Sequence, residues 1–128
     1  YFLRAFFHFM LTKNFGDVVV KTKSSTTLDA ALSAKSTRAD VYKQIYDDLN
    51  QAIPKLPSYS ANLVKGRASK ETAQGFFAKA ALYNEDWVTA LQQAEAVINS
   101  GKHSLVPDVR DVYNVTREDA VRNENMFA

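Results

Sequence analysis

Apolar residues recur along most of the chain with the period of an α-helix. Residues 1–14 are apolar on most sides and are followed by Gly16, which predicts a buried helix that ends near Asn14. Residues 39–53 form a second apolar pattern, and Pro54 stops it. The apolar positions of this second helix are four residues apart: Val41, Ile45, Leu49 and Ile53.

The second half of the chain carries two more helical patterns and a short one. The first covers about Lys70–Tyr83, with Ser69 as its expected N-cap. The next covers about Asp86–Asn99, and Gly101 is expected to be the left-handed residue that closes it. Pro107 suits the first turn of a short helix that continues through Tyr113.

Strand patterns are nearly absent from the sequence. No stretch alternates apolar and polar residues over more than about five positions, although residues 17–23 can be extended. The sequence therefore predicts an all-α fold.

Two of the predicted helices share one internal pattern, an aromatic residue followed by apolar residues at spacings of three, four and three. The second helix has Tyr42, Ile45, Leu49 and Ala52, and the fourth has Trp87, Ala90, Ala94 and Val97. This spacing is typical of the second helix of a tetratricopeptide repeat. The first helix of such a repeat matches Ala78 and Ala81. The predicted architecture is a set of tetratricopeptide-like antiparallel helical hairpins.

Alanines dominate the expected contact between the third and fourth helices. Helices pack with their axes about 8–10 Å apart, and small side chains give the shorter distances. We therefore expect Ala78 and Ala81 to face Ala90 and Ala94 across a close hairpin. Trp87 lies within the same pattern, so we interpret it as a packing residue rather than a platform for a sugar.

A long connection separates the first two helices. Residues 15–38 are rich in Ser, Thr and Lys, whereas about three residues join the third helix to the fourth. Loops longer than about 12–15 residues are usually functional or disordered. The sequence leaves open whether this loop is disordered, wraps along the protein, or contacts a ligand or partner.

Composition narrows the classes of function. The 128 residues carry a formal net charge of +2 with no polybasic face, so nucleic acid is not an expected partner. The absence of cysteine excludes disulfides and cysteine chemistry. The apolar segment 1–11 is too short for a transmembrane helix, which needs about 20 residues.

The residues that most often carry catalysis or bind metals form no recognisable motif. His8 and His103 are far apart in the sequence, without an accompanying carboxylate motif. The acidic pairs 47–48 and 85–86 lie on or near helix ends and faces, where they pair with helix dipoles or face solvent. We predict no catalytic residue, no metal site and no cofactor.

Five segments in order resemble one protein family. They are LRAFFHFML (3–11), NFGDV (14–18), VYKQIYDDLNQAIPKLP (41–57), GRASKETAQGFFAKAALYNEDW (66–87) and AEAVINSGKHSL (94–105). In this order they resemble the SusD/RagB family of outer-membrane nutrient-binding lipoproteins of Bacteroidota. The resemblance covers nearly the whole chain.

The resemblance implies that residues 1–128 are one helical-repeat region of a longer protein. That protein is expected to be tethered by a lipid to the extracellular face of the outer membrane, through a segment outside this sequence. It is expected to bind a glycan or another nutrient, without catalysis, beside a SusC-like TonB-dependent transporter. Its ligand-binding residues remain unknown from this sequence. The alternative is a tetratricopeptide-type adaptor that binds peptides.

Overall fold

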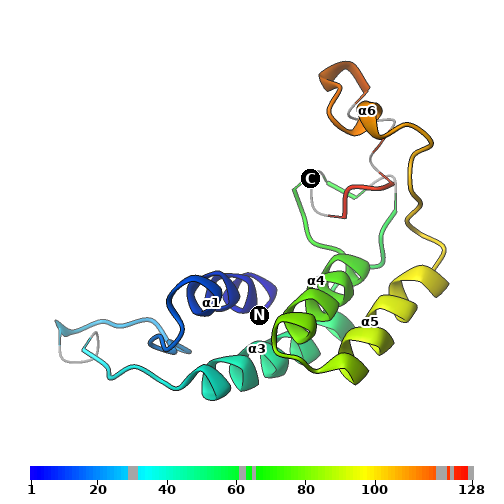
Figure 1. Cartoon of the computed structure of the whole chain (residues 1–128). Coiled ribbons are helices and arrows are strands. Elements are labelled where there is room, and N and C mark those ends of the chain that lie inside the picture. Colours follow the sequence, from blue (N-terminus) through cyan, green and yellow to red (C-terminus); the bar gives the residue numbers. More distant parts are fainter. Residues whose placement is uncertain (29–31, 61–62, 65, 118–120, 122, 127–128) are drawn as a thin grey trace. The chain divides into compact units, whose positions relative to one another are not determined.

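Helices make up most of the regular structure of this protein, as the computed structural model shows (Figure 1). The structure describes residues 1–128 except 29–31, 61–62, 65, 118–120, 122 and 127–128. These residues form two compact units, Tyr1–Gln51 and Ala52–Ala128. Among the described residues the only β pairing is one antiparallel bridge, between Val18 and Ser36. The all-α prediction is confirmed.

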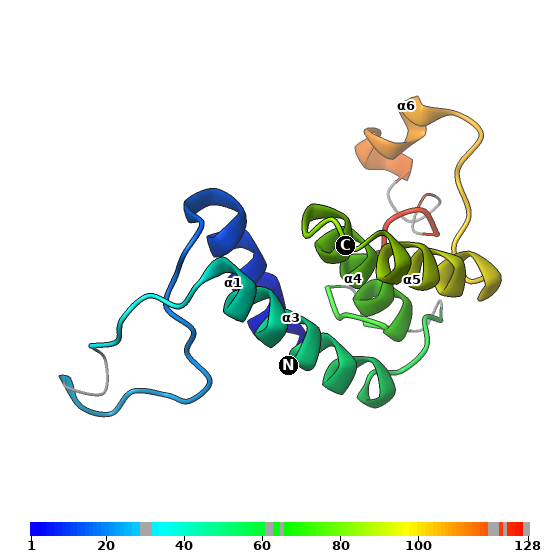
Figure 2. The same cartoon turned by 60° about the horizontal axis from the view of Figure 1, so that its bottom comes forward.

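The first unit contains helices α1 (Phe2–Phe15) and α3 (Arg38–Ala52). The α1 helix ends at Gly16, which has a φ of 71° and donates its backbone N–H to the carbonyl of Thr12. This left-handed conformation is easy for glycine and costly for other residues, which explains the end of the helix. The two helices lie next to each other in both views (Figures 1 and 2).

The start of α3 has a cap that the sequence pattern did not reveal. The hydroxyl of Thr37 accepts a hydrogen bond from the backbone N–H of Asp40, and it donates to the Asp40 carboxylate at 2.7 Å. At its other end α3 stops one residue earlier than predicted, at Ala52. A short 3-10 helix, η1 (Ile53–Lys55), follows because Pro54 has no backbone N–H to continue the α-helical pattern.

The second unit is built on helices α4 (Lys70–Tyr83) and α5 (Trp87–Asn99), which pack against each other as an antiparallel hairpin. Ser69 caps α4 as predicted: its side chain accepts from the backbone N–H of Thr72, whose own side chain accepts from the N–H of Ser69. Asp86 caps α5 by accepting from the backbone N–H of Thr89 at 3.1 Å. Gly101 has the predicted positive φ, 62°.

The segment after α5 differs from its predicted form. The short helix α6 covers Val109–Val112 and is followed by a 3-10 turn, η2 (Val115–Arg117). Pro107 lies outside α6 because Asp108 is the N-cap, accepting from the backbone N–H of Arg110 at 3.0 Å. The prediction that Pro107 begins this helix is therefore wrong, because it did not take account of Asp108 as a capping residue.

Candidate functional site

The long loop between α1 and α3 is fixed at its base. At its two ends, the carboxylate of Asp17 accepts from the backbone N–H of Arg38 at 2.8 Å, and the N–H of Ser36 donates to the carbonyl of Val18 at 2.9 Å. Among the described residues, the segment 17–23, expected to be extended, makes a β pairing only at Val18. The loop leaves the helices and returns to them in both views (Figure 2).

Arg4 joins three parts of the first unit. Its guanidinium donates two hydrogen bonds to the carboxylate of Asp48 on α3, one of them at 2.7 Å from Nε. It also donates to the backbone carbonyl of Thr22 in the loop at 2.8 Å. The hydrogen bonds that Arg4 donates to Asp48 raise the pKa of Arg4 above its already high ordinary value, against the opposing effect of burial. The guanidinium therefore remains charged and connects α1, α3 and the loop.

His8 lies one turn after Arg4 on the same helix and is 5% exposed. Its Nε2 accepts a hydrogen bond from the backbone N–H of Lys21 at 3.3 Å. Burial lowers the pKa of His8 below its ordinary value, the Asp48 charge opposes that effect, and the Arg4 charge adds to it. Helix α1 therefore contacts two successive loop residues, Lys21 and Thr22, through two polar side chains.

The α4–α5 hairpin has an open apolar groove along one side. The groove has a volume of about 400 Å³. Its lining residues are Ala78, Lys79, Leu82, Trp87, Ala90, Leu91 and Ala94. Lys79 is the one charged side chain among them, so the groove offers little hydrogen bonding to a sugar. It is suited to an apolar side chain or an apolar helix face.

The predicted packing residues occupy different environments. The positions on α3, together with Ala81 on α4, are buried, whereas α5 has no fully buried residue. Ala78, Ala90, Ala94 and Val97 are half-buried, and Trp87 is 62% exposed. The packing role of these residues stays a prediction, but the groove beside Ala94 has room for a larger side chain. The buried α3 residues are Tyr42, Ile45, Leu49 and Ala52.

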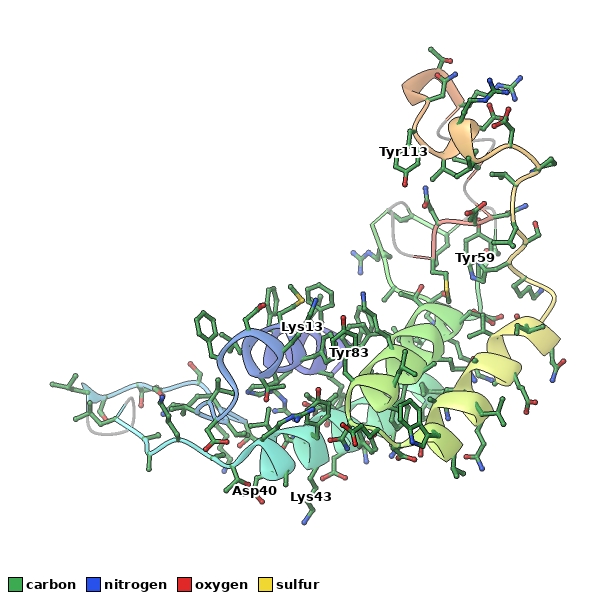
Figure 3. All side chains as sticks on the ribbon, in the orientation of Figure 1. Lys13, Asp40, Lys43, Tyr59, Tyr83 and Tyr113 are labelled. Atoms are coloured by element: carbon green, nitrogen blue, oxygen red, sulfur yellow. The ribbon has the colours of Figure 1, made fainter. Side chains whose placement is uncertain are left out.

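Tyr59, which is labelled in Figure 3, forms an aromatic and polar cluster with His103 and Asn123 in the second unit. The rings of Tyr59 and His103 are 4.6 Å apart between centroids, and the Tyr59 hydroxyl donates to the side-chain oxygen of Asn123 at 3.3 Å. His103 Nδ1 lies 2.9 Å from the backbone carbonyl of Asn123. These groups contact one another, so they hold the segment around Asn123 in place.

Glu71 positions Tyr59. The sequence did not reveal this role, because Glu71 is one of several acidic residues of the chain that lie in the first turn of a helix. Its carboxylate accepts from the Ser58 hydroxyl at 2.6 Å and from the backbone N–H of Tyr59 at 2.7 Å. Burial favours the neutral acid, but these hydrogen bonds outweigh it and lower the pKa of Glu71. Glu71 is only 3% exposed, and each of its two carboxylate oxygens accepts a hydrogen bond within the protein, so its role is structural.

A pocket of about 210 Å³ lies beside this cluster and has a mostly apolar lining. It is bounded by Val97, Ile98, His103, Ser104, Leu105, Glu124 and Met126. The Glu124 carboxylate accepts from the backbone N–H of Val106 at 2.7 Å. Some of the polar residues that line this pocket therefore already form hydrogen bonds within the protein.

Among the described residues, no group of three or more Asp, Glu, His or Cys side chains could hold a metal ion. His8 and His103 lie in different units, and each has its own backbone partner. Asp48 is paired with Arg4, and Asp86 caps α5. Each of these groups thus has a structural partner of its own.

The model of one protein family matches residues 1–82, and its description is "Starch-binding associating with outer membrane". This match covers more than half of the chain. The chain belongs to the SusD-like family. The resemblance that the sequence motifs indicated is therefore confirmed.

Individual relatives agree with this assignment. SusD-like protein P2 of Formosa agariphila is 28% identical over an alignment 123 positions long, which covers 91% of this chain and 24% of that protein. A SusD-like protein of Bacteroides fragilis is 28% identical, with a TM-score of 0.86 over 98% of this chain and 25% of the other. Another structure from B. fragilis, described as a SusD-like carbohydrate binding protein, is 25% identical, with a TM-score of 0.80 over 87% of this chain and 22% of the other.

The chain spans about a quarter of the length of the curated relatives it matches. None of the helices in the described residues has the length and apolar character that crossing a membrane requires.

Proposed function

We propose that this SusD-like chain is the helical part of a non-catalytic protein that captures glycans or other nutrients at the extracellular face of the outer membrane. In this proposal the protein is anchored by a lipid and works with a SusC-like TonB-dependent transporter. The observation that carries the proposal is the family match over residues 1–82, whose description names starch binding and the outer membrane. The structural relative described as carbohydrate binding adds support.

Within that protein, we assign the helices of this chain a supporting role. Sugar sites combine exposed aromatic faces with polar groups that are available for hydrogen bonds. Here Tyr59 and His103 contact each other and Asn123, whereas the groove beside Trp87 has little polar lining. The sugar-binding aromatic residues are therefore expected in other parts of the protein.

Binding experiments on two lengths of the protein test this proposal. Isothermal calorimetry of the full protein against starch, xylan and mucin glycans should give saturable binding to at least one of them. Residues 1–128 alone, with helical circular dichroism as a control for folding, should give none. Saturable binding by residues 1–128 contradicts the supporting role, and failure of the full protein with every glycan contradicts glycan capture.

The transporter partnership has a separate test. The full protein, tagged and extracted from outer membranes in mild detergent, should co-purify with a TonB-dependent transporter. Purification without any such transporter contradicts the partnership and leaves the glycan result unaffected.

The apolar groove on α4 and α5 favours a second candidate, a tetratricopeptide-type adaptor that binds an apolar peptide. Leu91 lines this groove and is exposed. A Leu91→Asp variant of such an adaptor should lose peptide capture. If the protein captures glycans as proposed, the variant should bind the same glycan as the unchanged protein.

A further inference from the structure

Two side chains on one face of α1 hold the first part of the long loop. Arg4 donates to the carbonyl of Thr22 at 2.8 Å, and His8, one turn further along α1, accepts from the N–H of Lys21 at 3.3 Å. Further along the loop, the Lys21 ammonium donates to the Ser33 hydroxyl at 2.6 Å. The loop backbone thus meets α1 at two successive residues.

The hydrogen bond to Lys21 requires a neutral imidazole at position 8. A nitrogen that accepts a hydrogen bond carries no proton, so the ring proton of neutral His8 is on Nδ1. In the described residues Nδ1 is buried and has no hydrogen-bond partner. A second proton on the ring converts Nε2 into a donor that faces another donor, the N–H of Lys21. Protonation therefore replaces an attractive contact with a repulsive one.

The charges around His8 come from both helices of the unit. Arg4 on α1 disfavours a second positive charge, and Asp48 on α3 favours it. Both carboxylate oxygens of Asp48 already accept hydrogen bonds from Arg4. Burial is the strongest influence, and the resulting pKa of His8 is below the ordinary value in the closed arrangement. An exposed imidazole in an opened loop has no such penalty.

We propose that His8 is a pH-sensitive latch for the loop: neutral His8 holds the backbone at Lys21 against α1, and protonation of His8 releases it. Arg4 does not titrate in this range, so the response to acid comes from the histidine alone. Protonation of His8 removes the hydrogen bond at the Lys21 backbone, whereas the hydrogen bond from Arg4 to the Thr22 carbonyl remains.

The size of the response follows from the difference in proton affinity between the open and closed states. The open state takes up the proton near the ordinary histidine pKa of about 6.5, and the closed state does so only at lower pH. The ratio of open to closed loop should therefore rise by up to about tenfold between pH 7.5 and pH 5.5.

Hydrogen exchange at the Lys21 amide measures this ratio directly. The experiment follows Lys21 by NMR from pH 7.5 to pH 5.5 and divides each rate by that of an unstructured peptide at the same pH. The resulting protection factor should fall by up to about tenfold over this range. Amides in α3, such as that of Leu49, should be more strongly protected than Lys21 at every pH, because the loop opens without the helix.

The chain has only two histidines, so two matched variants show which of them causes the pH dependence. In His8→Gln, whose neutral side chain can still accept a hydrogen bond, the protection of Lys21 should not depend on pH. In His103→Gln the fall in protection should be as large as in the unchanged protein. Constant protection in the unchanged protein, a fall that persists in His8→Gln, or protection at Lys21 equal to that at Leu49 each contradicts the latch.

A measurement on the unchanged protein covers the case in which His8→Gln does not fold. The nitrogen chemical shifts of the His8 ring report which nitrogen carries the proton at pH 7.5. The latch requires an unprotonated Nε2 and a protonated Nδ1. A proton on Nε2 overturns the proposal.

Discussion

Asp48 is a polar residue whose loss should strongly destabilise the first unit. It is 1% exposed, and its carboxylate accepts both hydrogen bonds from Arg4, whose side chain is partly exposed. Removing one partner of a buried ion pair leaves the other without compensation and costs about 3–5 kcal/mol. Because Arg4 can reach solvent, we expect Asp48→Asn to lower the free energy of unfolding by about 3 kcal/mol, the lower end of that range.

Urea unfolding measures this change, and the chain supplies a matched control at the neighbouring position. Asp47 is exposed, and Asp47→Asn should change stability by no more than about 0.5 kcal/mol. Equal effects of the two substitutions would show that the Arg4 pair contributes nothing beyond surface charge.

Acid should destabilise the first unit through His8 even if the loop stays closed. The folded-state pKa of His8 is lowered, so the unfolded chain binds the proton more readily. The stability that neutral His8 contributes is complete above the ordinary histidine pKa of about 6.5 and is lost as pH falls from there through the folded-state pKa. Thermal unfolding of the protein and of His8→Gln between pH 8 and pH 5 should show a smaller decrease for the variant. Parallel decreases would assign the acid effect to other groups.

At the scale of elements, the turn between α4 and α5 contains a strained residue. Glu85 has a φ of 60°, in the left-handed region that costs a residue with a side chain about 1 kcal/mol or more. Glycine adopts this conformation freely but also makes the unfolded chain more flexible. We expect Glu85→Gly to be neutral or to stabilise the hairpin by up to about 1 kcal/mol, as measured by thermal unfolding.

A substitution by glycine at an exposed position within a helix provides the comparison. Gln92 lies on the exposed face of α5, where Gln92→Gly should cost about 1 kcal/mol because glycine is a poor helix former. If Glu85→Gly costs as much as Gln92→Gly, the turn holds no strain that glycine relieves.

Gly75 is a glycine in the interior of α4, where alanine is ordinarily better by about 1 kcal/mol. The close neighbour of this position is the side chain of Met126. A Cβ at position 75 would lie 2.5 Å from the Met126 methyl carbon. The Thr72 hydroxyl also donates to the backbone carbonyl of Met126. The glycine thus makes room for the segment that returns to α4.

A double-mutant cycle separates helix propensity from this contact. Gly75→Ala alone should change stability little, because the gain in helix propensity is offset by the displacement of Met126. In a Met126→Ala background the same change should stabilise by about 1 kcal/mol. Identical effects of Gly75→Ala in both backgrounds would remove Met126 as the reason for the glycine.

At the scale of the whole molecule, the loop after α1 should be the first point of cleavage. The residues from Thr22 to Leu28 are exposed, and Arg4 on α1 donates to the carbonyl of Thr22, at the start of this stretch. We expect limited trypsin digestion at pH 8 to cut after the exposed Lys23 before any other site. Mass spectrometry of early products identifies the site. First cleavage at Lys79, within α4, would mean that the hairpin is less stable than the loop.

Periodicity and capping chemistry determined the helices in advance. The Ser69 cap, the bounds of α4 and the positive φ of Gly101 follow from local sequence, because caps and left-handed glycines act within a few residues. The family also followed from the order of motifs along the chain, and the match over residues 1–82 confirms it.

The tertiary structure decided which side chains meet across long sequence separations. The pairing of Arg4 with Asp48, 44 residues apart, and the contact of Gly75 with Met126 have no local signature. Trp87 and Tyr42 begin the same pattern, yet Trp87 is mostly exposed and Tyr42 is buried. Periodicity defines which face of a helix is apolar, but burial depends on which other segment of the chain covers that face, and that is set by long-range packing.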